Sequence, residues 1–161
     1  MNWEKLYSMQ QQLDAYISDN HKLEGKDLFS ERYLALLVEL GELANETRCF
    51  KFWSNKKRSA DAIILDEYVD GVHFLLSIGL EKNYRYPGNE IKLVEVDETK
   101  QFNEIFTKAA IFKQDPSLEK YIALFEAYVA LGKLLGYSET AIQEAYFKKN
   151  EINFERQDTG Y

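Results

Sequence analysis

The chain has 161 residues, with 27 acidic against 20 basic side chains, a formal net charge of −7 and a single cysteine. The lone cysteine excludes a disulfide scaffold, and two prolines with eight glycines exclude a collagen-like or Pro/Gly-rich disordered chain. The acidic balance argues against a nucleic acid polymer or a membrane surface as partner, since both require a basic face. With 45% hydrophobic residues and neither a signal peptide nor a membrane segment visible, we expect one cytoplasmic domain over residues 1–161.

Apolar residues at helical spacing predict an all-α protein, most simply a bundle of about six helices. The first segment carries such residues from Leu6 to Ile17. A second, long helix is expected from an N-cap at Asp27 to about Arg48. Its apolar stripe is predicted to include Leu34, Leu37, Val38 and Ala44. A third helix is expected to start after Ser59 and to end near Gly79; its stripe is predicted to include Ile63, Ile64, Tyr68, Val72, Leu75 and Leu76.

The main irregular stretch is expected at residues 83–97, where 86–89 form a turn signal and the alternating run 91–96 predicts a strand or an extended loop. Helices are then expected over residues 98–112 and from an N-cap at Asp115, followed by Pro116, to about Leu135. Gly136 ends that helix, and Ser138 is expected to cap a last helix that reaches about residue 156.

Two acidic pairs are the most informative feature of the sequence. Glu39 and Glu42 lie in the second helix, Glu67 and Asp70 in the third, and each pair is spaced i, i+3 on one helix face. Each pair is also embedded in an apolar stretch, and burying four carboxylates is costly unless a cation neutralises them. Oxygen ligands alone suit Mg²⁺, which proteins commonly hold together with substrate phosphates. The pattern therefore favours a magnesium site for phosphate chemistry.

The alternative is that these acids lie on solvated helix faces. Glu46 continues the first acidic stripe, and a metal ligand or a surface acid paired with a nearby base are equally good interpretations of it. Asp66 is expected beside the site or in solvent, and His73 is expected to be packed or hydrogen-bonded rather than a ligand. Gly41 and Gly71 stand next to the acids, where the missing side chain lets another group come close.

The segment between the acidic helices is basic and aromatic. Residues 47–60 contain five basic side chains and no acid, with Phe50, Phe52 and Trp53 interleaved. Because this segment joins the two acidic helices, its cations can hold phosphates and an aromatic ring can stack on a base. The alternative is a solvated loop that Trp53 anchors to the core.

The acidic pairs, 24 residues apart, resemble the ExxE…ExxD signature of the all-α nucleoside-triphosphate pyrophosphatases (MazG-like). Residues 146–161, YFKKNEINFERQDTGY, resemble the more specific Y-x2-K-N-x2-N-x2-R-Q-x2-G-Y motif of the dimeric dUTPases. Residues 9–14, MQQQLD, are similar to the LQxxLN segment of that family, with Asp14 where Asn is common. FKFW at residues 50–53 and HFLLS at residues 73–77 are similar to two further segments.

The resemblance implies a Mg²⁺-dependent homodimer that hydrolyses dUTP, and with it dUDP, to dUMP. It assigns the metal to Glu39, Glu42, Glu67 and Asp70, and we choose Glu39 to orient or deprotonate the attacking water. The resemblance and the chemistry of the side chains give nine candidate substrate-binding residues. These are Gln10, Asn150 and Asn153 for the base, Trp53 for stacking on it, Phe74 for the deoxyribose, and Lys51, Lys56, Lys149 and Arg156 for the phosphates.

Other functions remain open at this stage. The same acidic quartet would serve a house-cleaning pyrophosphatase for another nucleotide, such as dCTP or a modified nucleotide, because only the base pocket distinguishes the two. A non-catalytic helical binding module would keep the fold without activity, and a purely structural bundle would show no effect of metal on its stability. Lys149 and Arg156 could be surface bases paired with nearby glutamates, and Asn150 and Asn153 could be surface amides.

Overall fold

The computed structural model describes residues 1–92 and 97–160. All secondary structure in these ranges is helical, which confirms the predicted all-α fold with its six helices. The helices are α1 (Trp3–His21), α2 (Phe29–Thr47), α3 (Asp61–Lys82), α4 (Glu98–Gln114), α5 (Leu118–Leu134) and α6 (Glu139–Asp158). No helix in the described ranges is both long enough and apolar enough to cross a membrane.

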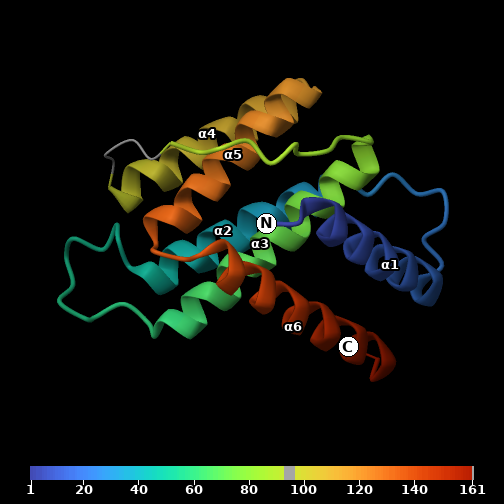
Figure 1. Ribbon diagram of the computed structural model, residues 1–161, viewed down its shortest axis with the longest axis horizontal. Coiled ribbons are helices and arrows are strands. Elements are labelled where there is room, and N and C mark those ends of the chain that lie inside the picture. The colour runs from blue at the N-terminus through green and yellow to red at the C-terminus, as the bar shows by residue number, and fades with distance from the viewer. Residues whose placement is uncertain (93–96, 161) are drawn as a thin grey trace.

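The central element is α3, which packs against α1, α2, α5 and α6. Helices α4 and α5 form a hairpin on one side of the molecule, while α1 and α6 lie together on the other side (Figure 1). The connection between α1 and α2 extends from one end of the molecule and the connection between α2 and α3 from the opposite end (Figure 1). Chemistry placed on α3 is therefore surrounded by side chains from most of the fold.

Glycines allow close packing between α3 and α5. The phenol oxygen of Tyr128 lies 2.0 Å from where a Cβ of Gly71 would stand, and Tyr68 fills the corresponding space beside Gly132. The two tyrosine rings stack at 4.8 Å, and each hydroxyl donates to the other residue's carbonyl. The group that comes close to Gly71 is thus a buried tyrosine of the fold. At Gly41, no described atom outside the backbone of its own helix lies within 4 Å of the position that a Cβ would occupy.

The predicted helix boundaries are right to within a few residues, and the differences lie at the caps. The first helical turn of α5 is capped by the Ser117 side chain, which accepts from the Lys120 amide, so the prediction of Asp115 as N-cap was wrong. Asp27 accepts from the Phe29 amide one position before the observed cap, Leu28. Helix α3 continues past Gly79 to Lys82. Residues 91–92 are irregular, and the rest of the possible strand lies outside the described residues.

The predicted apolar stripes of α2 and α3 were wrong at three positions. Leu34 and Val38 on α2 and Ile63 on α3 are exposed by 61%, 49% and 49%. The face of α2 that enters the core carries Leu36, Leu40 and Leu43 instead, each fully buried. Leu34 and Val38 are four residues apart and so share one helix face, which leaves an apolar strip on the outside of α2.

Candidate metal and nucleotide site

Three carboxylates from two helices converge beside the centre of α3. Glu39 of α2 and Glu67 and Asp70 of α3 each offer an oxygen atom, and these oxygen atoms lie within 4.8 Å of one another. Glu67 and Asp70 meet because residues three apart face the same way on a helix, and the packing of α2 on α3 adds Glu39. Glu42 is exposed and lies outside this cluster, although its charge acts on both Glu39 and Glu67. The cluster thus unites three of the four predicted ligands.

The acidic cluster lacks enough positive charge to balance it. Burial first, and then the carboxylates of Asp70, Glu42 and Glu67 in that order, together raise the pKa of Glu39 from 4.5 to about 7. Burial is also the first cause that raises the pKa values of Glu67 and Asp70. Carboxylates held together against their own repulsion form a donor set that fits a hard divalent cation such as Mg²⁺.

Lys149 of α6 compensates part of this charge. Its ammonium donates to Asp66 at 2.8 Å and forms an ion pair with Asp70 at 2.6 Å, and its side chain is 5% exposed. Burial lowers the pKa of Lys149, but the contacts to the two aspartates raise it more. The alternative of a surface base paired with a nearby glutamate is therefore wrong for Lys149, and Asp66 lies beside the site as expected.

A cavity of about 670 Å³ opens next to the cluster and is bordered by Glu39 and Asp70. It runs between α1, α2, α3 and α6 and is closed at one end by the connection from α1 to α2. Its volume lies in the usual range of small-molecule sites. A larger open groove of about 1380 Å³ lies at the start of α1, but the one group of three potential metal ligands found in the described residues borders the smaller cavity.

Four of the predicted substrate-binding residues line this cavity, and Gln10 of α1 is one of them. Phe74 comes from α3, and Asn153 and Arg156 come from α6. Arg156 also acts on the site electrostatically, since its charge lowers the pKa of Asp70. Phe74 is one turn beyond Asp70 on α3, so an apolar surface follows directly on the acidic cluster.

The segment between α2 and α3 contributes none of the described lining of the cavity. Lys51, Trp53 and Lys56 lie in this segment, and their role in binding stays a prediction. Trp53 is 65% exposed and its ring contacts only Phe50 and Phe52 among the described aromatic rings, so it does not anchor the loop to the core. Ser59 instead ties the loop to Glu46 through side-chain and backbone hydrogen bonds, which identifies Glu46 as a structural acid.

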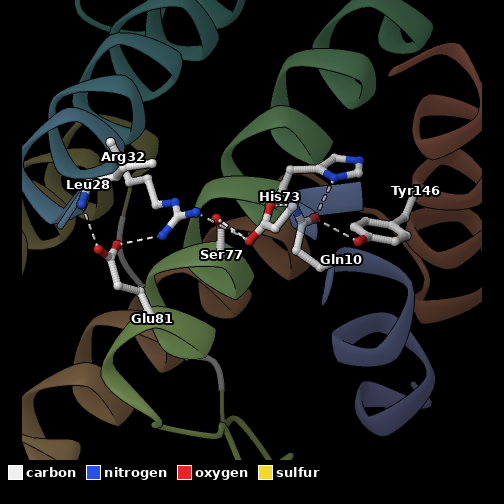
Figure 2. A network of polar contacts seen from close by, with 8 residues as sticks. Gln10, Leu28, Arg32, His73, Ser77, Glu81 and Tyr146 are labelled. Atoms are coloured by element: carbon white, nitrogen blue, oxygen red, sulfur yellow. Dashed lines mark hydrogen bonds and ion pairs between the residues drawn. The ribbon is translucent and has the colours of Figure 1, made fainter. Parts of the chain in front are cut away.

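A network of polar contacts forms the wall of the cavity away from the cluster (Figure 2). Asp14 of α1 accepts from Ser77 at 2.6 Å and from Gln10 at 2.8 Å, and the Arg32 guanidinium lies 3.8 Å from it. Arg32 also forms an ion pair with Glu81 at 2.7 Å. Burial raises the pKa of Asp14, whereas the bonds from Ser77 and Gln10 and the charge of Arg32 lower it.

Gln10, predicted to bind the base, has both ends of its side chain engaged inside the protein. Its amide nitrogen donates to Asp14, and its oxygen lies 2.7 Å from Nδ1 of His73 and accepts from the Tyr146 hydroxyl (Figure 2). His73 is buried and stacks on Tyr146 at 4.1 Å, as expected for a packed histidine. Asn150 is buried as well, so it is not a surface amide, and its nitrogen has no hydrogen-bond partner in the described structure.

Sequence reasoning assigned no role to four residues of this wall. Asp14 and Ser77 lie in segments that carried the family resemblance, so their positions gave a usable signal. Arg32 and Glu81 had no such signal, because an arginine and a glutamate 49 residues apart resemble ordinary surface charges until the fold joins α2 to the end of α3.

Comparison with protein families shows what this chain is similar to. A family model described as dUTPase matches residues 2–161, which is essentially the whole chain. Comparison with curated proteins gave no significant match. A match of this extent assigns the fold and the general activity: the chain belongs to the dUTPase family.

Proposed function

We propose that this protein is a Mg²⁺-dependent dUTP diphosphatase that hydrolyses dUTP, and also dUDP, to dUMP and so removes dUTP from the nucleotide pool. The observation that carries the proposal is the convergence of Glu39, Glu67 and Asp70 beside a cavity that Glu39 and Asp70 border, in a chain of the dUTPase family. A carboxylate cluster alone would suit many sites, but here it borders a cavity lined by Phe74 and Asn153.

The metal ligands of the proposed enzyme are Glu39, Glu67 and Asp70, with Glu42 completing the set from the exposed side of α2. When bound, Mg²⁺ supplies charge neutralisation to the phosphate oxygens and favours ionisation of water. Glu39 is the residue proposed to orient the attacking water and to accept its proton at a carboxylate oxygen. A carboxylate suffices as a base there, because a bound cation would already favour ionisation of the water.

The remaining residues bind the substrate. Arg156 is proposed to grip phosphate oxygens as a bidentate fork, and Lys149 to donate its ammonium from beside Asp70. Phe74 packs on the deoxyribose, where an added 2′-hydroxyl would meet an apolar ring. Asn153 reads the base as an amide, with Gln10 on the cavity wall and the buried Asn150 holding the shape of the site. Lys51, Trp53 and Lys56 are proposed to close over the nucleotide, on the strength of the family resemblance.

The proposed enzyme is a homodimer of single-domain subunits in the cytoplasm. The exposed apolar strip of Leu34 and Val38 on α2, with Ile63 on α3, is the surface proposed to pair with a second copy. A free cysteine, Cys49, suits a reducing compartment. Sedimentation equilibrium should give twice the mass of the 18.9 kDa chain, and Leu34→Glu should shift it to the monomer. A wild-type monomer would contradict the proposal.

The activity is tested by measuring pyrophosphate and phosphate release over a panel of nucleotides, with and without Mg²⁺. The proposal requires pyrophosphate from dUTP, phosphate from dUDP, and loss of both on removal of the metal. Turnover of dCTP or a modified nucleotide without turnover of dUTP would identify a house-cleaning pyrophosphatase of other specificity. No turnover together with nucleotide binding would identify a non-catalytic binding module.

A further inference from the structure

Asp14 and Arg32 stand side by side on the cavity wall, although they come from different helices. The Asp14 carboxylate and the Arg32 guanidinium approach to 3.8 Å, and both residues line the cavity. Their side chains are 18% and 22% exposed, so they are largely shielded yet still accessible from the cavity. No residue of the acidic cluster contacts either of them in the described network.

Asp14 is held about two helical turns along α3 from the acidic cluster. Ser77, which donates to Asp14, is seven residues beyond Asp70 on α3, or about 10 Å along the helix axis. Phe74 lies between them and also lines the cavity. A nucleotide whose phosphates lie at Asp70 and whose sugar lies on Phe74 therefore directs its base toward Asp14 and Arg32.

The Asp14 carboxylate and the Arg32 guanidinium together offer one hydrogen-bond acceptor and one donor, as a single amide group does. An ionised carboxylate only accepts hydrogen bonds and a guanidinium only donates them, whereas an amide does both on neighbouring atoms. Uracil presents an accepting O4 next to a donating N3–H, while cytosine presents a donating amino group next to an accepting N3. Asp14 alone would repel O4 and accept from the cytosine amino group. With Arg32 beside it, the wall becomes complementary to uracil when the guanidinium donates to O4 and the carboxylate accepts from N3–H, the order of contacts that cytosine cannot match.

Three further contacts fix the pair in this orientation. Ser77 and Gln10 donate to the two different oxygens of Asp14, which sets the plane of the carboxylate. Glu81 holds Arg32 at 2.7 Å with one carboxylate oxygen, and its other oxygen accepts from the Leu28 amide at 2.8 Å. Leu28 is the N-cap residue of α2 and lines the cavity, so this bond ties Glu81 to the cavity wall (Figure 2).

We propose that Arg32 is a specificity-determining residue that acts with Asp14 as a split amide to select uracil, and that Glu81 is the positioning residue for Arg32. This inference rests on the proposed function. The related motif has Asn where this chain has Asp14, and the inference assigns to Arg32 the hydrogen-bond donor that the Asn amide would supply. The inference assigns a binding role to Arg32, whose ion pair with Glu81 would otherwise be interpreted as purely structural.

A double-mutant cycle tests the pairing directly. The measured quantity is the ratio of kcat/KM for dUTP to that for dCTP, in wild type, Arg32→Gln, Asp14→Asn and the double variant. Arg32→Gln should lower this ratio about ten- to hundredfold, the value of a hydrogen bond to a charged group. In the Asp14→Asn background the amide supplies both functions, so the same change should alter the ratio by less than about threefold.

If Arg32→Gln lowers the dUTP-to-dCTP ratio equally in the wild-type and the Asp14→Asn backgrounds, the inference is overturned, because the effect of Arg32 would then not depend on Asp14. Arg32→Lys, which keeps the charge but loses the fork, should follow Arg32→Gln and serves where that variant does not fold. Glu81→Gln should raise KM for dUTP more than it lowers kcat, and an unchanged KM would remove its positioning role. Lys108→Gln, which breaks the exposed pair with Glu104 on α4, is the matched control and should leave the ratio unchanged.

Binding of products separates this inference from the proposed function. Calorimetry with dUMP and dCMP on the same variants should show the same change in preference as the kinetic ratio. If the wild type hydrolyses no nucleotide, the proposed function fails while the calorimetric preference still tests the pair. If the wild type hydrolyses dUTP but Arg32→Gln keeps the preference for uracil, only the inference fails.

Discussion

Replacing Glu39 by Gln should stabilise the metal-free protein, and the gain should grow with pH. Burial and three neighbouring carboxylates raise the pKa of Glu39 from 4.5 to about 7. Between these two values the folded state holds a proton that the unfolded state has released. The free energy of unfolding therefore falls as the pH rises from about 4.5 to about 7, and the full loss is present above that range.

The size of the effect follows from the shift. A difference of about 2.5 pKa units corresponds to about 3 kcal/mol, and solvent screening at this incompletely buried side chain reduces it to about 1–2 kcal/mol. Glutamine keeps the shape of the side chain and removes the charge. For a chain of this length, the expected gain at pH 8 is an increase of about 3–6 °C in the melting temperature, with almost none at pH 4.5.

Thermal melts of wild type and Glu39→Gln at pH 4.5 and pH 8, in chelator and in Mg²⁺, test this reasoning. Mg²⁺ should stabilise the wild type at pH 8 and stabilise the variant much less, since a ligand is lost. Glu104→Gln, an exposed glutamate of α4, is the control and should show no pH-dependent gain. If Glu39→Gln is no more stable than wild type at pH 8, the interpretation that the charge of Glu39 destabilises the metal-free acidic cluster is refuted.

Three other substitutions test separate parts of the site. Glu67→Gln should abolish dUTP turnover while circular dichroism shows an intact metal-free fold, and unchanged turnover would remove Glu67 from the metal site. Asn153→Ala should reduce discrimination for uracil in competition assays, whereas an equal loss for all bases would make Asn153 structural. Gly71→Ala should lower the free energy of unfolding in urea by about 1–3 kcal/mol, because its Cβ would overlap the Tyr128 hydroxyl. Gly41→Ala, with open space around it, should be neutral or stabilising by up to about 1 kcal/mol in a monomeric state.

The acidic cluster could be predicted because its information is local. Spacing of i, i+3 fixes that Glu67 and Asp70 share a helix face, whatever the rest of the chain does. Two such pairs on consecutive helices then meet if the helices pack as neighbours, as elements that follow one another in the chain usually do. The same reasoning placed Glu42 in the cluster. It failed to show that the packing of α2 leaves Glu42 exposed while Glu39 faces the cavity.

The face that a helix buries was harder to predict than the helix itself. Leu34 and Val38 fall at helical spacing, and so do Leu36, Leu40 and Leu43, so α2 carries two apolar stripes. The sequence does not say which stripe meets α3, and the prediction mixed the two, since Leu34 and Val38 are exposed while Ala44 is buried.

The glycines beside the acidic pairs show how one sequence feature can have two physical causes. Gly71 directly follows Asp70, and Gly41 lies two residues after Glu39. At both glycines we predicted that another group comes close. At Gly71 that group is Tyr128, whose hydroxyl bonds to the Tyr68 carbonyl and whose ring leaves no room for a Cβ. The glycine thus lets α5 support α3 directly behind Glu67 and Asp70, so the rigidity of the acidic cluster depends on an absent side chain. At Gly41 the space is open, and close approach there can come only from outside the described chain.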